Sequence, residues 1–517
     1  MVMEDYPAAA MVVLDGNPLS IDDVVVVARE GAAVEVGEEA RRRMAPSRAV
    51  VVALDSTDSV AYGVTTGFGA LADRVVPPDD RAALQRRVVI SHAAGMGAPL
   101  DAEIVRGMLL LRARTLCAGY SGVRPLLPES LVALLNSGLV PWVPEHGSLG
   151  ASGDLAPLAH ATACLLGEGW VWDGAGRRPA KEALAERGLN LIAVGPREGL
   201  ALINGTDAMS AVLALAVADL AELLRAADVV AAMSVEALLG TTTAFAERAV
   251  ALRPAPGQAA SAANLRALLS DSALVASHRE SHHALQDPYS LRCTPQVHGA
   301  ARDVHGFARE CVDRELEAVV DNPMVLDAEV VSGGNFHGQA LAYAADMLAS
   351  VCADMAAISE RRLDRLLDPS RSRGLPAFLT ANPGLNSGLM IIQYTAAAMV
   401  VELRAAATPI AVQSMSTSAG QEDHVSMGFT AAMRTRRSVL TLRMVLAAEL
   451  VAAAQALELR APLRPGPGTG AVLHSLRTCI AHLDDDRVLA GDLFEAVEWL
   501  RLRRWHDALP GVTDILR

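Results

Sequence analysis

The chain has 517 residues, of which 51% are hydrophobic and 3% are aromatic, and its formal net charge is -14. A chain of this length exceeds the usual size of one compact core, so we expect subdomains or an extended, oligomeric protein. The negative charge argues against nucleic acid and anionic membranes as partners. The six cysteines are scattered without CxxC spacing, and the N-terminus lacks the basic segment of a signal peptide. Together these features indicate reduced thiols and a cytoplasmic location.

The predicted elements are helices, short at first and then long. Residues 1–200 are interrupted by Gly and Pro and predict a more irregular N-terminal region. Ala-, Leu- and Met-rich segments with polar starts and Gly or Pro stops then predict long helices over residues 206–239, 339–368, 387–407 and 429–460. Apolar stretches such as residues 208–218 end at charged residues and are too short to span a membrane.

These long helices are apolar nearly all round, so they need burial on several sides. Packing across subunits would provide it. We therefore expect a mainly α fold, an elongated long-helix bundle over residues 201–460, with a small C-terminal helical region over residues 461–517.

Residues 147–157 read GSLGASGDLAP, and the centre of this run can convert its own backbone into an electrophile. If the Gly153 nitrogen attacks the Ala151 carbonyl and water is lost, a five-membered ring closes. Loss of the Ser152 hydroxyl as a second water then leaves a conjugated methylidene. Gly153 permits the close backbone approach because it has no Cβ. Protein side chains offer no good electron sink, and the chain carries no fingerprint of a borrowed cofactor.

The tripeptide alone favours a simpler interpretation, a turn leading into a helix that Asp154 would start. The longer context favours the electrophile. The segment GSLGASGDLAPLAH (147–160) resembles the signature of the aromatic amino acid ammonia-lyase family, in which this tripeptide forms a 4-methylidene-imidazol-5-one (MIO) group. Matching motifs recur along nearly the whole chain: YGVTTGFG (62–69), SHAAG (91–95), INGTD (203–207), QDPYSLRC (286–293), DNP (321–323), GNFHG (334–338) and QEDHVSMG (421–428).

The resemblance implies a lyase with an MIO group made from Ala151, Ser152 and Gly153, and with no dissociable cofactor. It also implies a homotetramer with active sites shared between subunits. Within the family, the likeness is greatest to the bacterial lyases that act on histidine.

Elimination of ammonia requires an electrophile, a base and a group that orients the substrate carboxylate. Arg292 matches the family's carboxylate clamp, a role suited to the bidentate guanidinium. Alternatively, Arg292 forms a salt bridge with an acid such as Asp287.

Tyr62 matches the base. A free tyrosine hydroxyl is a weak base at neutral pH, so this role needs a positive potential such as helix N-termini provide. The alternative for Tyr62 is an aromatic anchor for the loop GVTTGFG, which could act as a mobile lid.

Three further residues match the family's active site. Tyr289 matches a second tyrosine and lies three residues before Arg292, so the two share a side if this stretch is helical. Asn204 and Gln286 match amide residues near the electrophile and the substrate carboxylate. Either amide could instead be a turn or cap residue.

Substrate choice depends on His92, Phe336 and Glu422. An imidazole side chain needs a hydrogen-bonding partner, which a carboxylate or histidine offers, and the resemblance therefore implies conversion of L-histidine to urocanate and ammonia. The alternative is a lyase or 2,3-aminomutase acting on tyrosine or a related aromatic amino acid, because tyrosine-specific relatives also keep the histidine. Gly420 and Thr65 depart from the residues common in the family and bear on the substrate.

Other classes remain open on the residues alone. A fumarase–aspartase type of helical lyase has similar architecture but no built-in electrophile, and its GSS-containing loop is not seen. A structural helical oligomer would leave the loop uncyclised. His278, His282 and His283 have a spacing compatible with a metal site, but no second ligand cluster matches them, so we expect no metal.

Overall fold

The computed structural model describes residues 11–57, 60–174, 176–280, 285–509 and 516. The chain divides into two compact units, each built from three segments. Unit 1 comprises Met1–Ala218, Ala308–Asp346 and Pro409–Arg436, and unit 2 comprises Asp219–Phe307, Met347–Thr408 and Arg437–Arg517. This division follows contacts between segments far apart in the sequence. The expected division into residues 1–200, 201–460 and 461–517 stays a prediction.

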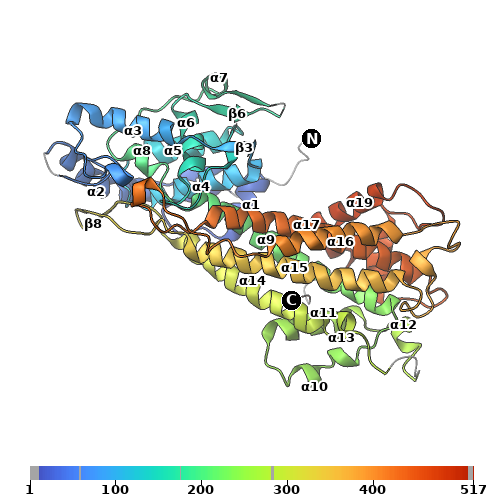
Figure 1. Cartoon of the computed structure of the whole chain (residues 1–517). Coiled ribbons are helices and arrows are strands. Elements are labelled where there is room, and N and C mark those ends of the chain that lie inside the picture. Colours follow the sequence, from blue (N-terminus) through green and yellow to red (C-terminus); the bar gives the residue numbers. More distant parts are fainter. Residues whose placement is uncertain (1–10, 58–59, 175, 281–284, 510–515, 517) are drawn as a thin grey trace. The chain divides into compact units, whose positions relative to one another are not determined.

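Unit 1 contains eight short or medium helices in the described residues (Figure 1). They are α1 (Ile21–Arg29), α2 (Glu38–Asp55), α3 (Pro78–His92), α4 (Ala102–Cys117), α5 (Leu126–Asn136), α6 (Leu155–Leu165), α7 (Ala180–Glu186) and α8 (Glu198–Ala201). The apolar helix α4 packs against α1 and α5, and α3 packs against α6 and α8. The second group carries the candidate site.

Small sheets join the helices of unit 1. Strand β1 (Val12–Leu14) pairs in parallel with β2 (Val34–Val36), and three antiparallel sets follow: β3 (Met96–Pro99) with β5 (Pro144–His146); β4 (Val140–Pro141) with β6 (Trp170–Trp172) and β7 (Arg177–Pro179); and β8 (Met324–Leu326) with β9 (Glu329–Val331).

In the described residues of unit 2, all regular secondary structure is helical. Its own helices are α10 (Glu247–Val250), α11 (Pro256–Leu268), α12 (Ala273–Ala276), α13 (Tyr289–Arg292), α16 (Met390–Ala406), α18 (Pro467–Arg477), α19 (Ala490–Arg501) and α20 (Arg504–Ala508). Four of the five boundaries between the units fall inside the four longest helices, α9 (Asp207–Ala237), α14 (Thr294–Glu317), α15 (Gln339–Leu367) and α17 (Gly428–Glu458), and the fifth follows α16.

The mainly α fold is confirmed, since 58% of the chain is helical. The four long helices expected from the sequence correspond to α9, α15, α16 and α17. The small C-terminal helical region corresponds to α18, α19 and α20.

Buried charges in the core of unit 2 are paired. Glu449 of α17 is fully buried and accepts hydrogen bonds from Arg362 Nε at 2.5 Å, Ser359 Oγ at 2.6 Å and Ser234 Oγ at 2.7 Å. Removing one of these partners would leave the buried carboxylate poorly paired and would strongly destabilise the fold. The cluster therefore fixes the positions of the unit 2 parts of α9, α15 and α17 relative to one another.

By length and composition alone, α15 and α17 could each cross a membrane. Within the protein, 67% of the most apolar 18-residue stretch of α15 is buried, and 89% of the corresponding stretch of α17. Burial of this extent is also a property of core helices, so these two helices are weak evidence for a membrane.

Candidate active site

The Ala151-Ser152-Gly153 segment forms a tight turn directly before α6. The Gly153 N–H donates to the Gly150 carbonyl at 3.3 Å, and the Asp154 N–H donates to the Gly205 carbonyl at 2.7 Å. Ser152 has a φ of 50° and Gly153 a φ of 77°, both in the left-handed region. The turn therefore brings the backbone atoms on either side of Ser152 close together.

Neighbouring segments leave no space around the glycines of this turn. A Cβ on Gly153 would lie 2.1 Å from the Gly205 carbonyl oxygen, and a Cβ on Gly150 would lie 2.2 Å from Ser426 Oγ. Only glycine fits such an approach, particularly at a positive φ. The loop is consequently fixed between the INGTD and QEDHVSMG segments.

Asp154 lies buried beneath the turn. Its carboxylate accepts hydrogen bonds from Ser148 Oγ and from the Met209 N–H, both at 2.8 Å. Desolvation raises the pKa of Asp154 to about 7, although these hydrogen bonds act to lower it. The sequence suggested only a helix start here, and Asp154 is indeed the residue before α6, but its side chain does not cap that helix.

A cavity of about 390 Å³ opens at this turn within unit 1. It is lined by four of the expected site residues, Tyr62, His92, Ser152 and Glu422. These residues come from four motifs that are far apart in the sequence. The N-terminus of α6 also reaches the cavity through Leu155, so this helix directs its partial positive charge toward the site.

Tyr62 contacts the expected lid. Its hydroxyl accepts a hydrogen bond from the Gly69 N–H at 3.4 Å, and its ring meets the Phe68 ring edge to face at 6.5 Å. The residue after the lid is tied to the turn before the QED segment, because the Ala70 N–H donates to Ser418 Oγ at 3.2 Å. Tyr62 thus contacts the loop and also lines the cavity, and its role as the base stays a prediction.

Glu422 and His92 bring polar groups to the same cavity. Glu422 accepts a hydrogen bond from Thr417 Oγ1 at 3.2 Å. His92 is the last residue of α3, and its Nδ1 lies 3.1 Å from Ser91 Oγ. Each side chain is only half-buried, so each keeps access to the cavity.

Four of the thirteen non-glycine residues with left-handed backbone in the described chain lie on segments at the site. The non-glycine residues Ser152, Ser418, Ala419 and Met427 have φ values of 50°, 50°, 53° and 55°. Such conformations are uncommon for residues with side chains and persist where surrounding contacts enforce them. Of these four residues, Ser152 and Ser418 line the cavity.

Asn204 and Phe336 belong to unit 1 but, among the described residues, fall outside the lining of the cavity. Asn204 is buried. Its amide nitrogen donates to the Asn322 carbonyl, while its Oδ1 has no hydrogen-bond partner in the described part of the chain. Phe336 is half-buried in the segment before α15.

Gln286, Tyr289 and Arg292 belong to unit 2. Helix α13 places the Arg292 guanidinium 4.7 Å from the centre of the Tyr289 ring, so the two side chains do lie on one side. Gln286 and Tyr289 are exposed. Asp287 is bound by Arg373 at 2.9 Å and by the Thr241 N–H at 2.7 Å, which leaves the alternative Asp287–Arg292 salt bridge without support.

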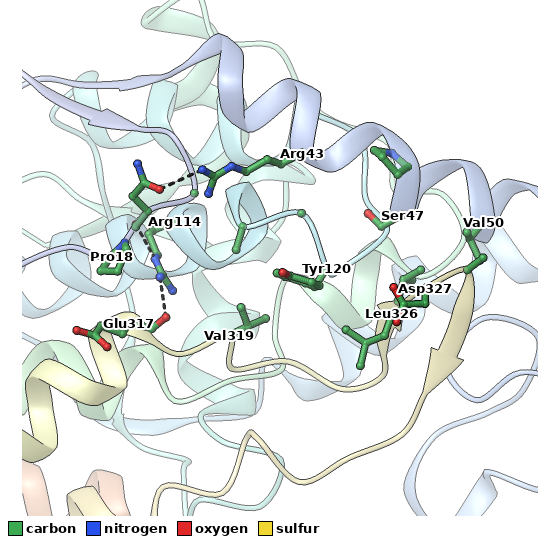
Figure 2. Close-up of a pocket in the computed structure, with 17 residues that line it drawn as sticks. Pro18, Arg43, Ser47, Val50, Arg114, Tyr120, Glu317, Val319, Leu326 and Asp327 are labelled. Carbon is green, nitrogen blue, oxygen red and sulfur yellow. Dashed lines mark hydrogen bonds between the residues drawn. The ribbon is translucent and has the colours of Figure 1, made fainter.

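A larger cavity in unit 1, of about 820 Å³, contains none of the expected site residues (Figure 2). Its two arginines are already bound: Arg114 donates to the Asn17 carbonyl at 3.0 Å and to the Glu317 carbonyl at 2.8 Å, and Arg43 donates to Asn17 Oδ1 at 3.1 Å.

The histidines considered for a metal are only partly described. His278 Nε2 lies 3.1 Å from the Gly240 carbonyl, and His282 and His283 lie outside the described residues. Within the described ranges, no three His, Cys, Asp or Glu side chains gather in a way that could hold a metal ion.

Comparison with known proteins decides the family. The sequence model of the aromatic amino acid lyase family matches residues 19–478. The chain belongs to the aromatic amino acid lyase family. It is 48% identical to a histidine ammonia-lyase of Streptomyces coelicolor, over 98% of this chain and 99% of that protein. It is 49% identical to a histidine ammonia-lyase of Gloeobacter violaceus, over 94% and 95% of the two chains.

Solved structures of this family share the fold. A tyrosine aminomutase from Streptomyces globisporus matches with a TM-score of 0.94 and 35% identity, covering 98% of this chain and 100% of that one. A histidine ammonia-lyase from Trypanosoma cruzi matches with a TM-score of 0.90 and 38% identity, covering 98% and 96%. The resemblance seen in the motifs is confirmed, and with it the expected enzyme class, an ammonia-lyase.

Sequence reasoning missed three polar residues of the cavity lining, of which Ser91 stands in the SHAAG motif and the other two lie outside the motifs. Arg87 lies on α3, and Ser418 lies in the turn before Glu422. Neither belongs to a motif whose chemistry is evident from residue types. The helical spacing of Arg87 from Ser91 was the one available signal.

Proposed function

We propose that this protein eliminates ammonia from L-histidine without oxidation and releases urocanate. The observation that carries the proposal is the cavity in which Ser152, Tyr62, His92 and Glu422 meet. The relatives named histidine ammonia-lyase, which match nearly the whole chain, support histidine as the substrate.

The turn at Ala151-Ser152-Gly153 fits an MIO group. Ring closure needs a small residue, a leaving hydroxyl and a residue without a Cβ in a compressed backbone, and the turn offers all three, with Gly153 closed against Gly205. The group would supply the electron sink that no side chain provides. Ser152 lines the cavity, so the methylidene formed from it would face the substrate.

Tyr62 is the proposed base. Its oxygen takes a proton from the β-carbon of the substrate, the electrons of that C–H bond form the carbon–carbon double bond, and the bond from the α-carbon to nitrogen breaks as ammonia leaves. The nearby N-terminus of α6 favours the negative charge that a tyrosinate carries. Asn204 lies beneath the turn with an oxygen free to accept a hydrogen bond.

Glu422 and His92 are the proposed specificity residues. Glu422 is held by Thr417 and can accept a hydrogen bond from an imidazole N–H, while His92 contacts the other side of the ring or sets its tautomer. Phe336 would contribute apolar contact. A substrate ring without N–H groups would leave the Glu422 carboxylate unpaired, which is costly.

Gln286, Tyr289 and Arg292 are proposed to reach the cavity from a neighbouring subunit of a homotetramer, with Arg292 binding the substrate carboxylate. Unit 2 presents apolar side chains to solvent that such an assembly would cover: Ile391, Tyr394 and Val401 of α16 are 55%, 61% and 63% exposed, and Phe494 of α19 is 71% exposed. Contiguous exposed apolar surface is typical of protein interfaces. We further propose a cytoplasmic location.

A lyase or 2,3-aminomutase acting on tyrosine or a related amino acid is the second candidate. It is favoured by the match to the tyrosine aminomutase structure at a TM-score of 0.94. Since both reactions use the same electrophile and base, the described geometry supports either.

The decisive experiment is a panel of aromatic amino acids with product chromatography, combined with intact-mass measurement of the wild type and Ser152→Ala. We expect urocanate as the main product and a wild-type mass lower by two waters. Ser152→Ala should fold, keep its full mass and lose activity. Tyrosine deamination or a β-amino acid product would contradict the histidine assignment, and an active protein of unreduced mass would contradict the electrophile.

A further inference from the structure

One face of α3 lines the candidate active site. Leu84, Arg87, Val88 and Ser91 all border the cavity, and their spacing of three, one and three residues is that of a single helix face. Three of these residues are apolar or small. Arg87 is the one cation on this face, and the reaction proposed above gives it no role.

The Arg87 side chain is exposed, and no hydrogen bond or ion pair to it is found within the described residues. Its helix neighbours three and four residues away are Ala83, Leu84, Ile90 and Ser91, none of them an acid. The preceding residue differs: Arg86 forms an ion pair with Glu168 at 2.5 Å and lies outside the cavity lining. Of two adjacent arginines, the one facing the cavity is thus the one whose charge is available.

The cavity carries one further fully charged side chain among its described lining residues, Glu422. Glu422 comes from a different segment and is held by Thr417 Oγ1 at 3.2 Å. A carboxylate ligand would be repelled by Glu422 and attracted by Arg87. The protein as a whole, with a net charge of -14, also repels anions, so a local cation has a large effect on anion entry.

We propose that Arg87 forms a carboxylate-binding subsite on α3, separate from Arg292. It would hold the carboxylate of an aromatic or heteroaromatic amino acid as it enters, and the carboxylate of the unsaturated acid as it leaves. The product has lost the ammonium group and is a net anion, so the subsite acts more strongly on product than on zwitterionic substrate. This inference rests on the proposed deamination but not on histidine being the substrate.

The test compares Arg87→Gln, Arg87→Lys and the matched control Arg86→Gln in the full-length oligomer. Inhibition constants are measured for urocanate, 4-hydroxycinnamate and cinnamate, each at low and high salt, against whichever amino acid the wild type deaminates. In Arg87→Gln we expect the inhibition constant of the matching product and the KM to rise by about three- to tenfold at low salt, with kcat nearly unchanged. Screening should shrink this difference at high salt. Arg87→Lys should recover much of the binding, and Arg86→Gln should match the wild type.

Three outcomes would overturn the subsite. Arg87→Gln could bind product carboxylates as tightly as the wild type at low salt. Arg86→Gln could weaken binding equally, which would indicate a general effect of surface charge. Arg87→Gln could also dissociate the oligomer in light scattering, which would assign Arg87 to an interface. Failure of the histidine proposal appears separately, as a different product from the wild type, and leaves this comparison intact.

Discussion

Ser152 combines a reactive hydroxyl with a φ of 50°, an uncommon conformation for a residue with a side chain. The conformation is enforced by glycines on both sides that no other residue could replace without a clash. The strain is therefore built into the turn of the folded chain, which supports the proposed conversion of this backbone into an MIO group.

Arg292→Lys tests the carboxylate clamp. Lysine keeps the charge but loses the planar fork and its stacking on the Tyr289 ring, so kcat/KM should fall by about two orders of magnitude while folding is retained. Steady-state kinetics and circular dichroism measure the two properties, and Arg279→Lys, at an exposed position of the same unit, serves as the control. A kcat/KM of Arg292→Lys close to that of the wild type would show that Arg292 has only a structural role.

Glu422→Gln tests the substrate assignment. Removing the carboxylate should lower kcat/KM for histidine by roughly tenfold or more, because a charged hydrogen bond to the imidazole is lost, while an apolar aromatic amino acid should lose less. Competition assays with paired amino acids measure the ratio directly. Asp423→Asn removes one charge at the next, exposed position and should not change the ratio. An equal loss of kcat/KM for both substrates would show that Glu422 does not determine specificity.

At this scale, Ser152 was predicted from the chemistry of its own tripeptide, and Tyr62, His92 and Glu422 were predicted because each lies in a motif that resembles the family's. It could not predict that they share one cavity, which depends on packing between segments hundreds of residues apart. Arg87 and Asp154 were missed for the same reason. Arginine within a helix and aspartate just before a helix are both common in sequences. Only the surroundings of Arg87 and Asp154 in the folded protein make them unusual.

Among the elements, the short helix α6 and the long helix α9 meet at Asp154, through its hydrogen bond to the Met209 N–H. Burial raises the pKa of this carboxyl from 3.8 to about 7 in the folded protein. The folded state therefore holds a proton that the unfolded chain releases, and the free energy of unfolding should fall as pH rises from about 4 to 7.

Asp154→Asn should flatten that pH dependence, by on the order of a few kcal/mol across the interval. Urea unfolding at several pH values measures it, and Asp484→Asn, at a side chain 89% exposed, is the control. Asp207, whose pKa burial raises to about 6, contributes in the same direction and remains in both proteins. An unchanged slope in Asp154→Asn would show that Asp154 is ionised in the fold at these pH values.

The long apolar helices were predictable because their composition admits few alternatives, and α15 begins at the expected residue, Gln339. Helix α14 was not predicted. Its sequence is polar overall and contains Gly299 and Gly306, so its helical character rests on one apolar face rather than on an apolar run. The strands have only two to four residues, which is too short for composition to predict them.

At the scale of the whole molecule, composition indicated helices that need burial on several sides. Exposed apolar residues remain on α16, and their burial by packing across subunits stays a prediction. The grouping of segments into two units was not predictable. Each unit joins three stretches of sequence, and the order of a chain does not reveal which distant stretches come together.

The expected site residues are divided between the units, with Ser152 in one and Arg292 in the other. If a working site draws these two residues from different subunits, two inactive variants can repair one another. Ser152→Ala and Arg292→Lys, co-expressed in equal amounts with different affinity tags, should form mixed oligomers in which about a quarter of the sites inherit both intact halves. Recovered activity in doubly purified protein would measure this complementation. The absence of recovery would mean that each chain builds its site alone, and two damaged copies of the gene could then never compensate.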